Sequence, residues 1–376
     1  MSKLFFFFPL ASIGGTERVH LDVLNALSDY DKEIYIRYRR NPWKGMAYRK
    51  SREANVEGIQ LLPEFKKHGT VHIVSRFLEA PRFGRLIGAW FTKRLAKKIN
   101  ACDKPIVVYW HRESIAFLWE HLAPHVKIID IIHNNSNNDS PDATYLTMDW
   151  APRINARVLV HQGLKKFIEP LYEEDLQRKE LSSRLRVIPH GVPIPDSMPN
   201  KTSDGFHVLF VGRNAHEKRF PLFLEIAKRL ATNTTIHFHV VGIEPNHDSM
   251  SAQNIKWHGV ISDKKSLEAL YRYCHVLILT SSSEGFPMVI AEAMASGCVP
   301  IVTSVGAIPN LLQHGKEVFL TSPDHCVNES ADIINALIND PERFNEHAKK
   351  AYIYACKHFD LTRFTLDWRT FIQSLG

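Results

Sequence analysis

Two glutamates, Glu284 and Glu292, stand eight residues apart in the segment SSSEGFPMVIAEAMASG at 281–297. Carboxylates accept hydrogen bonds from hydroxyl groups, and sugars are rich in hydroxyls. Glu284 precedes the apolar part of the segment, whereas Glu292 falls about one and a half turns inside the helix expected there. The spacing favours a ligand with hydroxyl groups at two places. A solvent-facing Glu284 and a Glu292 paired with a lysine would account for the same residues.

The same segment predicts a helix that begins at the end of a strand. HVLILT (275–280) predicts a buried strand, Pro287 suits the first helical position, and Gly297 suits the C-terminal cap. The free N–H groups of such a helix, from Met288 to Ile290, attract phosphate, and Gly285 lets the backbone approach a ligand closely. A diphosphate between two polyhydroxyl groups, as in a nucleotide sugar, fits this arrangement.

A second charged loop, in VGRNAHEKRF at 211–220, repeats this arrangement two β–α units earlier. A strand ends at Gly212, and Arg213 and Lys218 then flank a loop before a helix. Two cations at this position can bind a diphosphate and neutralise the charge of a leaving phosphate. Alternatively, Glu217 pairs locally with the cations and the loop binds no ligand.

Both loops lie in a chain of alternating strands and helices. Strand-like runs are found at 4–10, 33–39, 106–110, 127–133, 157–161, 186–191, 207–212, 236–242, 255–260, 275–280, 299–304 and 318–320. Helical patterns such as 13–28 and 263–273 lie between them. This alternation predicts parallel sheets covered on both faces, and hence an α/β fold with two Rossmann-like domains facing a central cleft.

The domain boundary is predicted in VPIPDSMPNKTSDG (192–205), which is rich in Pro, Ser, Asp and Asn. We expect a first domain at 1–195, a second at 196–355 and a C-terminal helix at 356–376. That helix either packs on the second domain or crosses back to the first.

The charge is uneven along the chain. The net charge is +7, and residues 1–195 hold 30 of the 47 Lys and Arg residues but only 21 of the 40 Asp and Glu residues. The whole basic excess therefore belongs to the first half. Such a field favours an anionic partner, such as a phospholipid surface, a polyprenyl phosphate, an acidic saccharide or a nucleic acid.

Cysteine usage and hydropathy indicate a cytoplasmic protein. The five cysteines are widely spaced and contain no CxxC pair, which is typical of reduced thiols. The apolar start at 4–11 is interrupted by Pro9 and is too short to span a membrane. It predicts a buried first strand.

Taken together, these segments resemble family 4 of the retaining GT-B glycosyltransferases. EGFPMVIAEAMASG resembles the family's E-x7-E motif, and VGRNAHEKR resembles its G-R-x-x-x-x-K loop. GGTERV (14–19) is similar to the first glycine loop. RVIPHGVPI (186–194) is similar to the I-P-N-G-V segment, with His190 where asparagine is usual. The resemblance covers nearly the whole chain and is weakest in residues 37–105.

The resemblance implies a reaction and a role for each matching residue. The reaction is transfer of a sugar from a nucleotide donor to an acceptor hydroxyl with retention of the anomeric configuration. Glu284 would contact the sugar hydroxyls and Glu292 the ribose, and Arg213 and Lys218 would hold the diphosphate. His133, which ends IIDIIH, matches a family histidine that touches the transferred sugar, although a core or surface histidine is the alternative. The other implied donor contacts are Gly14, Gly15, Val260, Gly285, Phe286, Pro287, Met288 and Val289.

We expect neither a metal nor another cofactor. DYD at 29–31 has the spelling of the DxD motif that carries a metal in GT-A enzymes, but it follows a helix and predicts a turn. Arg213, Lys218 and the helix N-terminus would then stabilise the negative charge of the leaving group. The resemblance implies front-face attack, in which the leaving phosphate helps to deprotonate the acceptor. Family frequencies favour UDP-sugars over GDP-sugars.

The acceptor is less clearly indicated. IRYRRNPWKGMAYRKSR (36–52) has seven cations and no acid, with Tyr38, Trp43 and Tyr48 between them. This composition suits an anionic membrane surface and equally a solvated loop or a groove for an anionic saccharide. We expect a saccharide or lipid-linked acceptor, a role in cell-envelope polysaccharide or glycolipid synthesis, and peripheral contact with the inner face of the plasma membrane.

Two alternatives remain open on the same fold: a non-catalytic protein that binds sugar nucleotides, and a GT-B epimerase. Intact Glu284, Glu292, Arg213 and Lys218 argue against the non-catalytic alternative. A nucleic-acid-binding protein is disfavoured because RNP, KH, helix-turn-helix and zinc-finger patterns are absent from the sequence.

Overall fold

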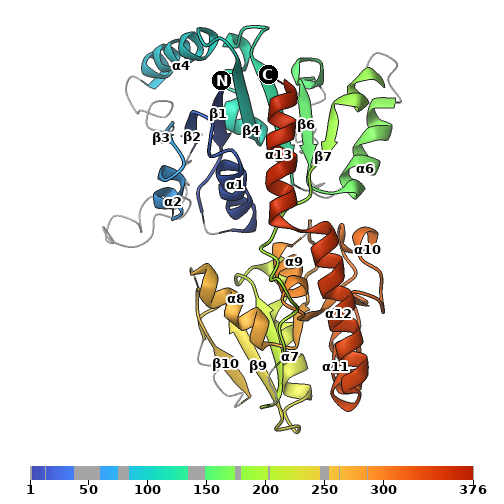
Figure 1. The fold of residues 1–376 in the computed structure, drawn as a ribbon. Coiled ribbons are helices and arrows are strands. Elements are labelled where there is room, and N and C mark those ends of the chain that lie inside the picture. Colours follow the sequence, from blue (N-terminus) through green and yellow to red (C-terminus); the bar gives the residue numbers. More distant parts are fainter. Residues whose placement is uncertain are drawn as a thin grey trace, which may run out of the picture. The chain divides into compact units, whose positions relative to one another are not determined.

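A computed structural model describes residues 2–12, 14–37, 60–74, 84–133, 149–173, 179–201, 204–245, 254–261, 263–285 and 287–375. The chain divides into two compact units, which we describe separately. Unit 1 comprises Met1–Ile188 with Phe364–Gly376, and unit 2 comprises Pro189–Arg363. Figure 1 shows the elements of both units.

Unit 1 is built on a seven-stranded parallel sheet in the order β3-β2-β1-β4-β5-β6-β7 (Figure 1). Its strands are β1 (Lys3–Phe8), β2 (Lys32–Ile36), β3 (Thr70–Ile73), β4 (Pro105–Trp110), β5 (Lys127–Ile132), β6 (Ala156–Leu159) and β7 (Leu185–Val187). The strand order reverses between β1 and β4. The carboxyl ends of strands at such a reversal are where open α/β sheets bind ligands.

Helices cover this sheet. They are α1 (Gly15–Ala26), α2 (Leu62–Lys66), α4 (Gly84–Asn100), α5 (Arg112–Ile115) and α6 (Gln162–Glu173), with 3-10 turns at Trp119–His121, Ala151–Arg153 and Lys179–Arg184. The residues of β1 from Leu4 to Phe8 are fully buried because the strand is central and covered on both faces. The predicted buried first strand is therefore present.

Unit 2 contains a six-stranded parallel sheet in the order β10-β9-β8-β11-β12-β13. Its strands are β8 (Phe206–Val211), β9 (Ile236–Val241), β10 (Ile255–Trp257), β11 (Val276–Leu279), β12 (Val299–Thr303) and β13 (Phe319–Thr321). Its helices are α7 (Phe220–Arg229), α8 (Lys264–Tyr273), α9 (Met288–Ala295), α10 (Ile308–Leu311), α11 (Cys326–Asn339) and α12 (Pro341–His358), with a 3-10 turn at His216–Lys218. The two parallel sheets confirm the predicted α/β class with two Rossmann-like domains.

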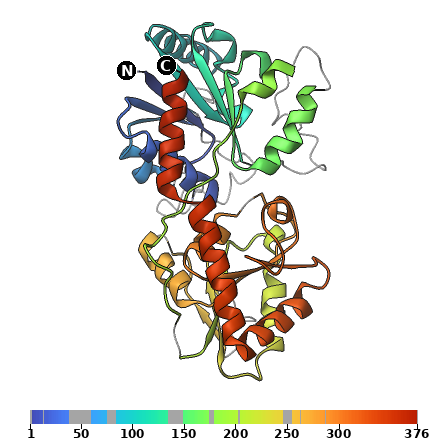
Figure 2. The same ribbon diagram turned by 45° about the vertical axis from the view of Figure 1, so that its right-hand side comes forward.

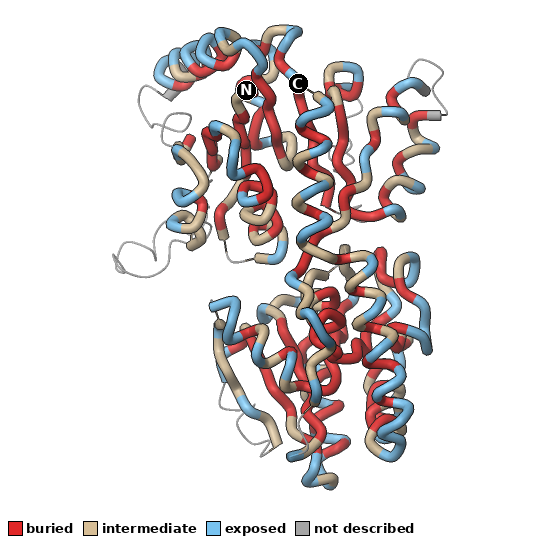
Figure 3. Tube along the Cα trace, in the orientation of Figure 1, coloured by how far each residue is buried: buried red, intermediate tan, exposed pale blue. Residues whose placement is uncertain are grey.

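Each face of the second sheet has its own core. Leu209 and Leu277 pack with Met294 in one cluster, while Phe210 packs with Phe223 in the other. Alternate residues of each strand thus serve opposite faces, as a sheet covered on both sides requires. Figure 3 shows most of these strands as largely buried segments, whereas the residues of the edge strand β10 are intermediate or exposed.

The connections at the boundary of unit 2 are short and hydrogen-bonded. The amide of Val192 donates to the Phe359 carbonyl at 2.7 Å, and the amide of Leu361 donates to the Val192 carbonyl at 3.1 Å. These bonds tie the segment after β7 to the segment after α12. The last described helix, α13 (Leu361–Leu375), belongs to unit 1 from Phe364 onward.

Helix α13 is anchored in unit 1 by its aromatic face. Phe364, Trp368 and Phe371 are buried on it, and the Arg369 guanidinium donates from Nε to the Ala26 carbonyl at 2.7 Å. Figure 2 shows α13 running alongside the elements of this unit. None of the described helices is long and apolar enough to cross a bilayer.

Candidate functional site

A largely buried ion pair joins the two charged loops of unit 2. Lys218 Nζ lies 2.5 Å from Glu284 Oε1, and the two side chains are 17% and 9% exposed. The Ser281 hydroxyl donates to the same carboxylate oxygen at 2.6 Å. Lys218 follows β8 and Glu284 follows β11, which are neighbouring parallel strands. The carboxyl ends of adjacent strands therefore bring together residues that are 66 positions apart.

Arg219, which the sequence did not single out, holds the two loops in place. Its guanidinium donates to the carbonyl oxygens of Thr280, Pro323 and Ser281 at 2.6, 2.9 and 3.3 Å. Its backbone has φ 46°, in the left-handed region that a bulky residue seldom occupies. This conformation is sustained by the surrounding hydrogen bonds and turns the chain from the Lys218 loop into α7.

A glycine beyond both motifs supports the backbone of Glu284. Gly306, after β12, has φ 59°, and a Cβ atom at this position would overlap the Glu284 carbonyl oxygen. Glycine is required there for both its backbone conformation and its lack of a side chain. Sequence spacing gives no signal for this contact, because Gly306 belongs to a different β–α unit.

Helix α9 starts after the loop that follows β11, as predicted, and therefore close to the ion pair. Pro287 is the residue before the first helical turn, with an extended backbone, rather than the first helical residue that the sequence suggested. Ile290 donates to the Pro287 carbonyl at 3.0 Å, so the N–H groups without a helical partner are those of Met288 and Val289. Gly297 follows the helix with φ 65°, which fits a glycine C-terminal cap.

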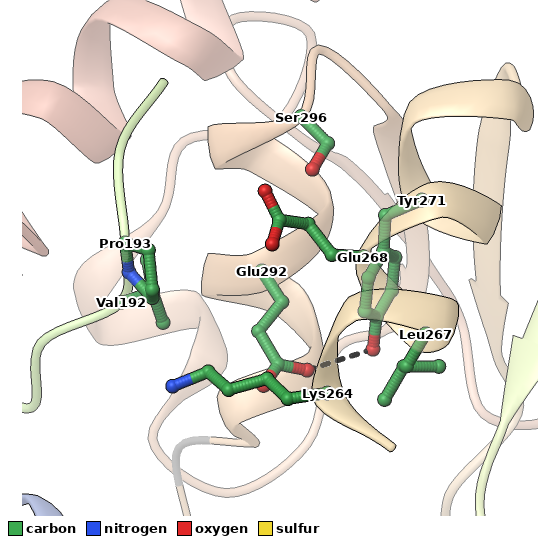
Figure 4. Close-up of a pocket in the computed structure, with 8 residues that line it drawn as sticks. All are labelled: Val192, Pro193, Lys264, Leu267, Glu268, Tyr271, Glu292 and Ser296. Carbon is green, nitrogen blue, oxygen red and sulfur yellow. Dashed lines mark hydrogen bonds between the residues drawn. The ribbon is translucent and has the colours of Figure 1, made fainter. Parts of the chain in front are cut away.

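Glu292 lies on α9 in a pocket of unit 2 (Figure 4). The Tyr271 hydroxyl donates to Glu292 Oε2 at 2.9 Å. Figure 4 shows the Lys264 side chain extending past Glu292. The pocket is lined by Val192, Pro193, Lys264, Leu267, Glu268, Tyr271, Glu292 and Ser296. Its lining therefore includes two carboxylates, an ammonium group and an aromatic ring, and the Tyr271 partner of Glu292 was not predicted.

Arg213 is an exposed cation of the charged loop at 211–220. It is 77% exposed and donates to Glu217 Oε1 at 2.7 Å. This is the local pair that the sequence left open as an alternative for the loop. A backbone hydrogen bond, and then the Arg213 charge, hold the pKa of Glu217 below its ordinary value. An exposed pair of this kind contributes little to the stability of the protein.

Of the other predicted residues of unit 2, Gly285 lies in the loop after β11 and Val260 lies after β10 of the same sheet. Val260 follows β10 and is 57% exposed, and Gly285 is half-buried. Phe286 lies outside the described residues. The amide of Gly242, after β9, donates to the Gly259 carbonyl at 2.7 Å and fixes the backbone just before Val260.

In unit 1, His133 is paired with a second histidine. His133 follows β5 and is 9% exposed, and its Nε2 lies 3.0 Å from Nε2 of His20 on α1. The Trp110 ring, at the end of β4, contacts both imidazoles. Burial, and then the neighbouring His20, lower the pKa of His133 well below its ordinary value. His133 is therefore neutral at neutral pH and can exchange hydrogen bonds without carrying positive charge.

Gly14 and Gly15 lie at the start of α1. Gly14 is the residue before the helix, and a Cβ atom there would overlap the carboxylate of Glu17. The Ser12 hydroxyl donates to Glu17 Oε1 at 2.8 Å. The glycine loop thus brings a carboxylate to the helix N-terminus, which the glycine motif alone did not indicate.

The DYD segment is a turn, as predicted, and its acids have partners. Asp29 lies 3.1 Å from the Arg369 guanidinium, and Asp31 lies 2.8 Å from Lys3 Nζ. Within the described part of the chain, no cluster of three or more His, Cys, Asp or Glu residues is placed to hold a metal ion.

Comparison with known proteins matches parts of this chain to glycosyltransferases. Residues 205–340 match the family described as glycosyl transferases group 1. A 2-deoxystreptamine N-acetyl-D-glucosaminyltransferase of Niallia circulans is 29% identical over 142 residues, which are 35% of this chain and 36% of that protein. A GDP-mannose:cellobiosyl-diphosphopolyprenol alpha-mannosyltransferase of Komagataeibacter xylinus is 27% identical over 197 residues, 47% of this chain and 49% of that protein. The matched segments thus span half or less of the length of these relatives.

Solved structures match over the whole length. Anabaena Alr3699/HepE in complex with UDP has a TM-score of 0.73 at 19% identity, covering 99% of this chain and 100% of that chain. The apo form of the lipopolysaccharide outer core galactosyltransferase WaaB has a TM-score of 0.68 at 18% identity, covering 100% and 99%. At such identities the likeness establishes a shared fold.

Proposed function

We propose that this chain, which belongs to the group 1 glycosyltransferases over residues 205–340 and has the GT-B fold, is a retaining glycosyltransferase that uses a nucleotide diphosphate sugar. The observation that carries the proposal is the Lys218–Glu284 pair beside the N-terminus of α9. A cation, a carboxylate and backbone N–H groups without a helical partner lie after the carboxyl ends of two neighbouring strands. This is the set of groups that a sugar linked to a diphosphate needs.

Each group then has a role in transfer. Lys218, Arg213 and the N-terminus of α9 stabilise the diphosphate as the bond between the anomeric carbon and phosphate oxygen breaks. Glu284 accepts hydrogen bonds from the sugar hydroxyls. The acceptor oxygen bonds to the anomeric carbon from the same face, and its proton passes to the departing phosphate oxygen.

In this proposal Glu292 contacts the ribose. Glu292, held by the Tyr271 hydroxyl that donates to it, provides carboxylate acceptors for ribose hydroxyls. The exposed backbone at Val260 takes the base. We favour UDP-sugars because HepE has been solved with UDP and with UDP-glucose. GDP-sugars are the second choice, because the Komagataeibacter relative is named for GDP-mannose.

Unit 1 binds the acceptor in this proposal. His133, neutral and held by His20, contacts the transferred sugar, and Gly14 and Gly15 let donor and acceptor approach the strand ends. The basic excess of residues 1–195 suits an anionic or lipid-linked saccharide acceptor of the cell envelope, and peripheral contact with a membrane. The segment 36–52 that suggested this contact lies, apart from its first two residues, outside the described residues.

A thermal-shift series tests donor binding. The protein is heated with UDP, GDP and their sugar conjugates, because a ligand that binds the folded state raises the melting temperature. We expect one nucleotide series to stabilise the protein and Lys218→Ala to abolish the effect. NMR of the product with an acceptor library then checks that the anomeric configuration is retained. Donor binding without turnover of any acceptor would favour the non-catalytic alternative, and no binding at all would overturn the proposal.

A further inference from the structure

Helix α4 of unit 1 carries large apolar side chains on its outer face. Leu86 is 73% exposed, Ile87 39% and Trp90 57%. The other exposed large apolar residues of the described chain are dispersed over other elements: Phe167, Val260, Ile353 and Leu366. Single exposed apolar residues are ordinary, whereas three within about one turn form a patch that requires an explanation.

The opposite face of α4 is fixed in the core. Leu95 and Ile99 are buried with Val107 of β4 and Leu118, and Phe91 packs against the same cluster. The helix therefore cannot rotate to bury Leu86 and Trp90 without exposing this core. Figure 3 shows exposed and buried segments alternating along α4, as expected of a helix with one covered face.

The exposed face is divided along the helix axis. Positions 86, 90, 93 and 97 follow one another at helical spacing, so they share one stripe. The stripe is apolar in the first half, at Leu86 and Trp90, and cationic in the second half, at Lys93 and Lys97, both of which are exposed. Arg94 lies beside it, with its guanidinium 5.2 Å from the Trp90 ring centroid.

The charge of α4 has one sign. Its sequence, GRLIGAWFTKRLAKKIN, has five cations and no acid. Lys98 Nζ lies 2.6 Å from Glu33 Oε2, a buried carboxylate, and is committed to the fold. The exposed cations Lys93, Arg94 and Lys97 therefore give the outer face of α4 a positive electrostatic potential. This potential complements an anionic surface.

We propose that α4 docks on an anionic phospholipid bilayer. Leu86, Ile87 and Trp90 enter the boundary between headgroups and acyl chains, where an indole ring is favoured. Lys93, Arg94 and Lys97 contact the lipid phosphates. Charge complementarity and the exposed indole select this occupant over a second copy of the chain, whose matching face would be equally cationic. The inference gives the membrane contact of the proposed function a defined surface, and otherwise does not depend on the sugar donor.

Vesicle flotation tests the proposal with the full chain. The protein is mixed with vesicles of phosphatidylcholine alone or with about one third phosphatidylglycerol, at low and high salt. We expect flotation only with the anionic vesicles, weakened by salt. Leu86→Ser with Trp90→Ser should abolish it, and Lys93→Ala and Lys97→Ala should each weaken partitioning about fivefold.

Leu366→Ser is the matched control, because Leu366 is 61% exposed on α13 of the same unit and should not affect flotation. Every variant is also tested for stabilisation by nucleotide sugars, which should be unchanged. That readout shows that the variant is folded, and it separates failure of the docking proposal from failure of the donor proposal. Equal flotation on neutral and anionic vesicles, or flotation that survives the α4 substitutions, would overturn the proposal. So would a dimer that Leu86→Ser with Trp90→Ser converts to a monomer in light scattering while no vesicle binds.

Discussion

Lys218 Nζ and Glu284 Oε1 lie 2.5 Å apart although the residues come from loops that are 66 positions apart in the sequence. The contact couples the loop that supplies cations to the loop that supplies the carboxylate. It orients the Glu284 side chain, and Ser281 adds a hydrogen bond to the same oxygen. The ends of the two strands thus hold the side chains of the candidate site in a fixed arrangement.

Breaking this pair should cost stability as well as activity. Lys218→Met leaves a nearly buried carboxylate without its cation, and we expect a loss of about 1–3 kcal/mol in the free energy of unfolding, below the range for fully buried pairs. Adding Glu284→Gln removes the unpaired charge and should restore part of the loss. Urea unfolding of both single variants and the double variant measures the coupling. Strictly additive losses would show that the pair contributes no interaction energy.

Arg213→Ala should separate donor binding from stability. Arg213 is 77% exposed and paired with the surface residue Glu217, so its loss should change the free energy of unfolding by less than about 1 kcal/mol. Donor stabilisation should nevertheless be lost, because the guanidinium is available to the diphosphate. Isothermal calorimetry with the stabilising nucleotide sugar checks this result. Unchanged affinity would exclude Arg213 from the donor site.

Gly306→Ala should displace Glu284 and lower both stability and donor affinity. The substitution adds a methyl group where the Glu284 carbonyl oxygen lies, and it strains a backbone with φ 59°. Gly315→Ala is the control, because Gly315 has φ 72° but an added methyl group would meet no atom within 4 Å. We expect Gly315→Ala to cost only backbone strain of about 1 kcal/mol and to leave donor affinity intact. Equal effects of both variants in denaturation and binding would contradict a specific role for Gly306.

A row of histidines in unit 2 should make stability depend on pH. His207 Nδ1 lies 3.0 Å from His239 Nε2, and His239 Nδ1 lies 3.0 Å from His258 Nε2. The row ends on Asp204, 3.1 Å from His207 Nε2. Burial, followed by the charges of His207, His258 and Lys256, lowers the pKa of His239 to about 3. A lowered pKa means that the unfolded chain binds this proton first as the pH falls.

The stability contributed by the neutral row is therefore present above pH 6.5, the ordinary histidine value, and is lost as the pH falls toward 3. Urea unfolding at pH 7, 6 and 5 should show a falling free energy. His239→Gln cannot titrate and should flatten the slope. His325→Gln, at an exposed position before α11, should leave the slope unchanged. A slope that is the same in His239→Gln and the parent protein would disprove this origin.

Local sequence patterns were sufficient to predict most strands of the fold, although the edge strand β3 at Thr70–Ile73 was not among those predicted. Apolar runs of strand length alternate with amphipathic stretches, and runs such as LFFFF at 4–8 and HVLILT at 275–280 became buried strands. The periodicity of side-chain burial is a local property of a strand or helix, so it is written in consecutive residues. Pro287 was misplaced by one position because a helix start is decided by backbone bonds that spacing does not show.

Local sequence patterns did not predict which residues contact the site residues. Arg219, Gly306, Tyr271 and His20 gave no motif, yet they hold the loops, support Glu284, bind Glu292 and pair with His133. Each contact joins segments far apart in the chain. Which segments meet depends on strand order, and the sequence alone does not give strand order.

Composition and spacing are enough to show which loops carry cations, carboxylates and glycines, and that each follows a strand, because these signals act within one β–α unit. Only the folded chain shows which residues meet. Lys218 contacts Glu284, His20 contacts His133, and Trp90 remains outside the core. Those outcomes depend on the order in which strands lie side by side and on which helix face the sheet covers. Both are settled by packing over the whole unit.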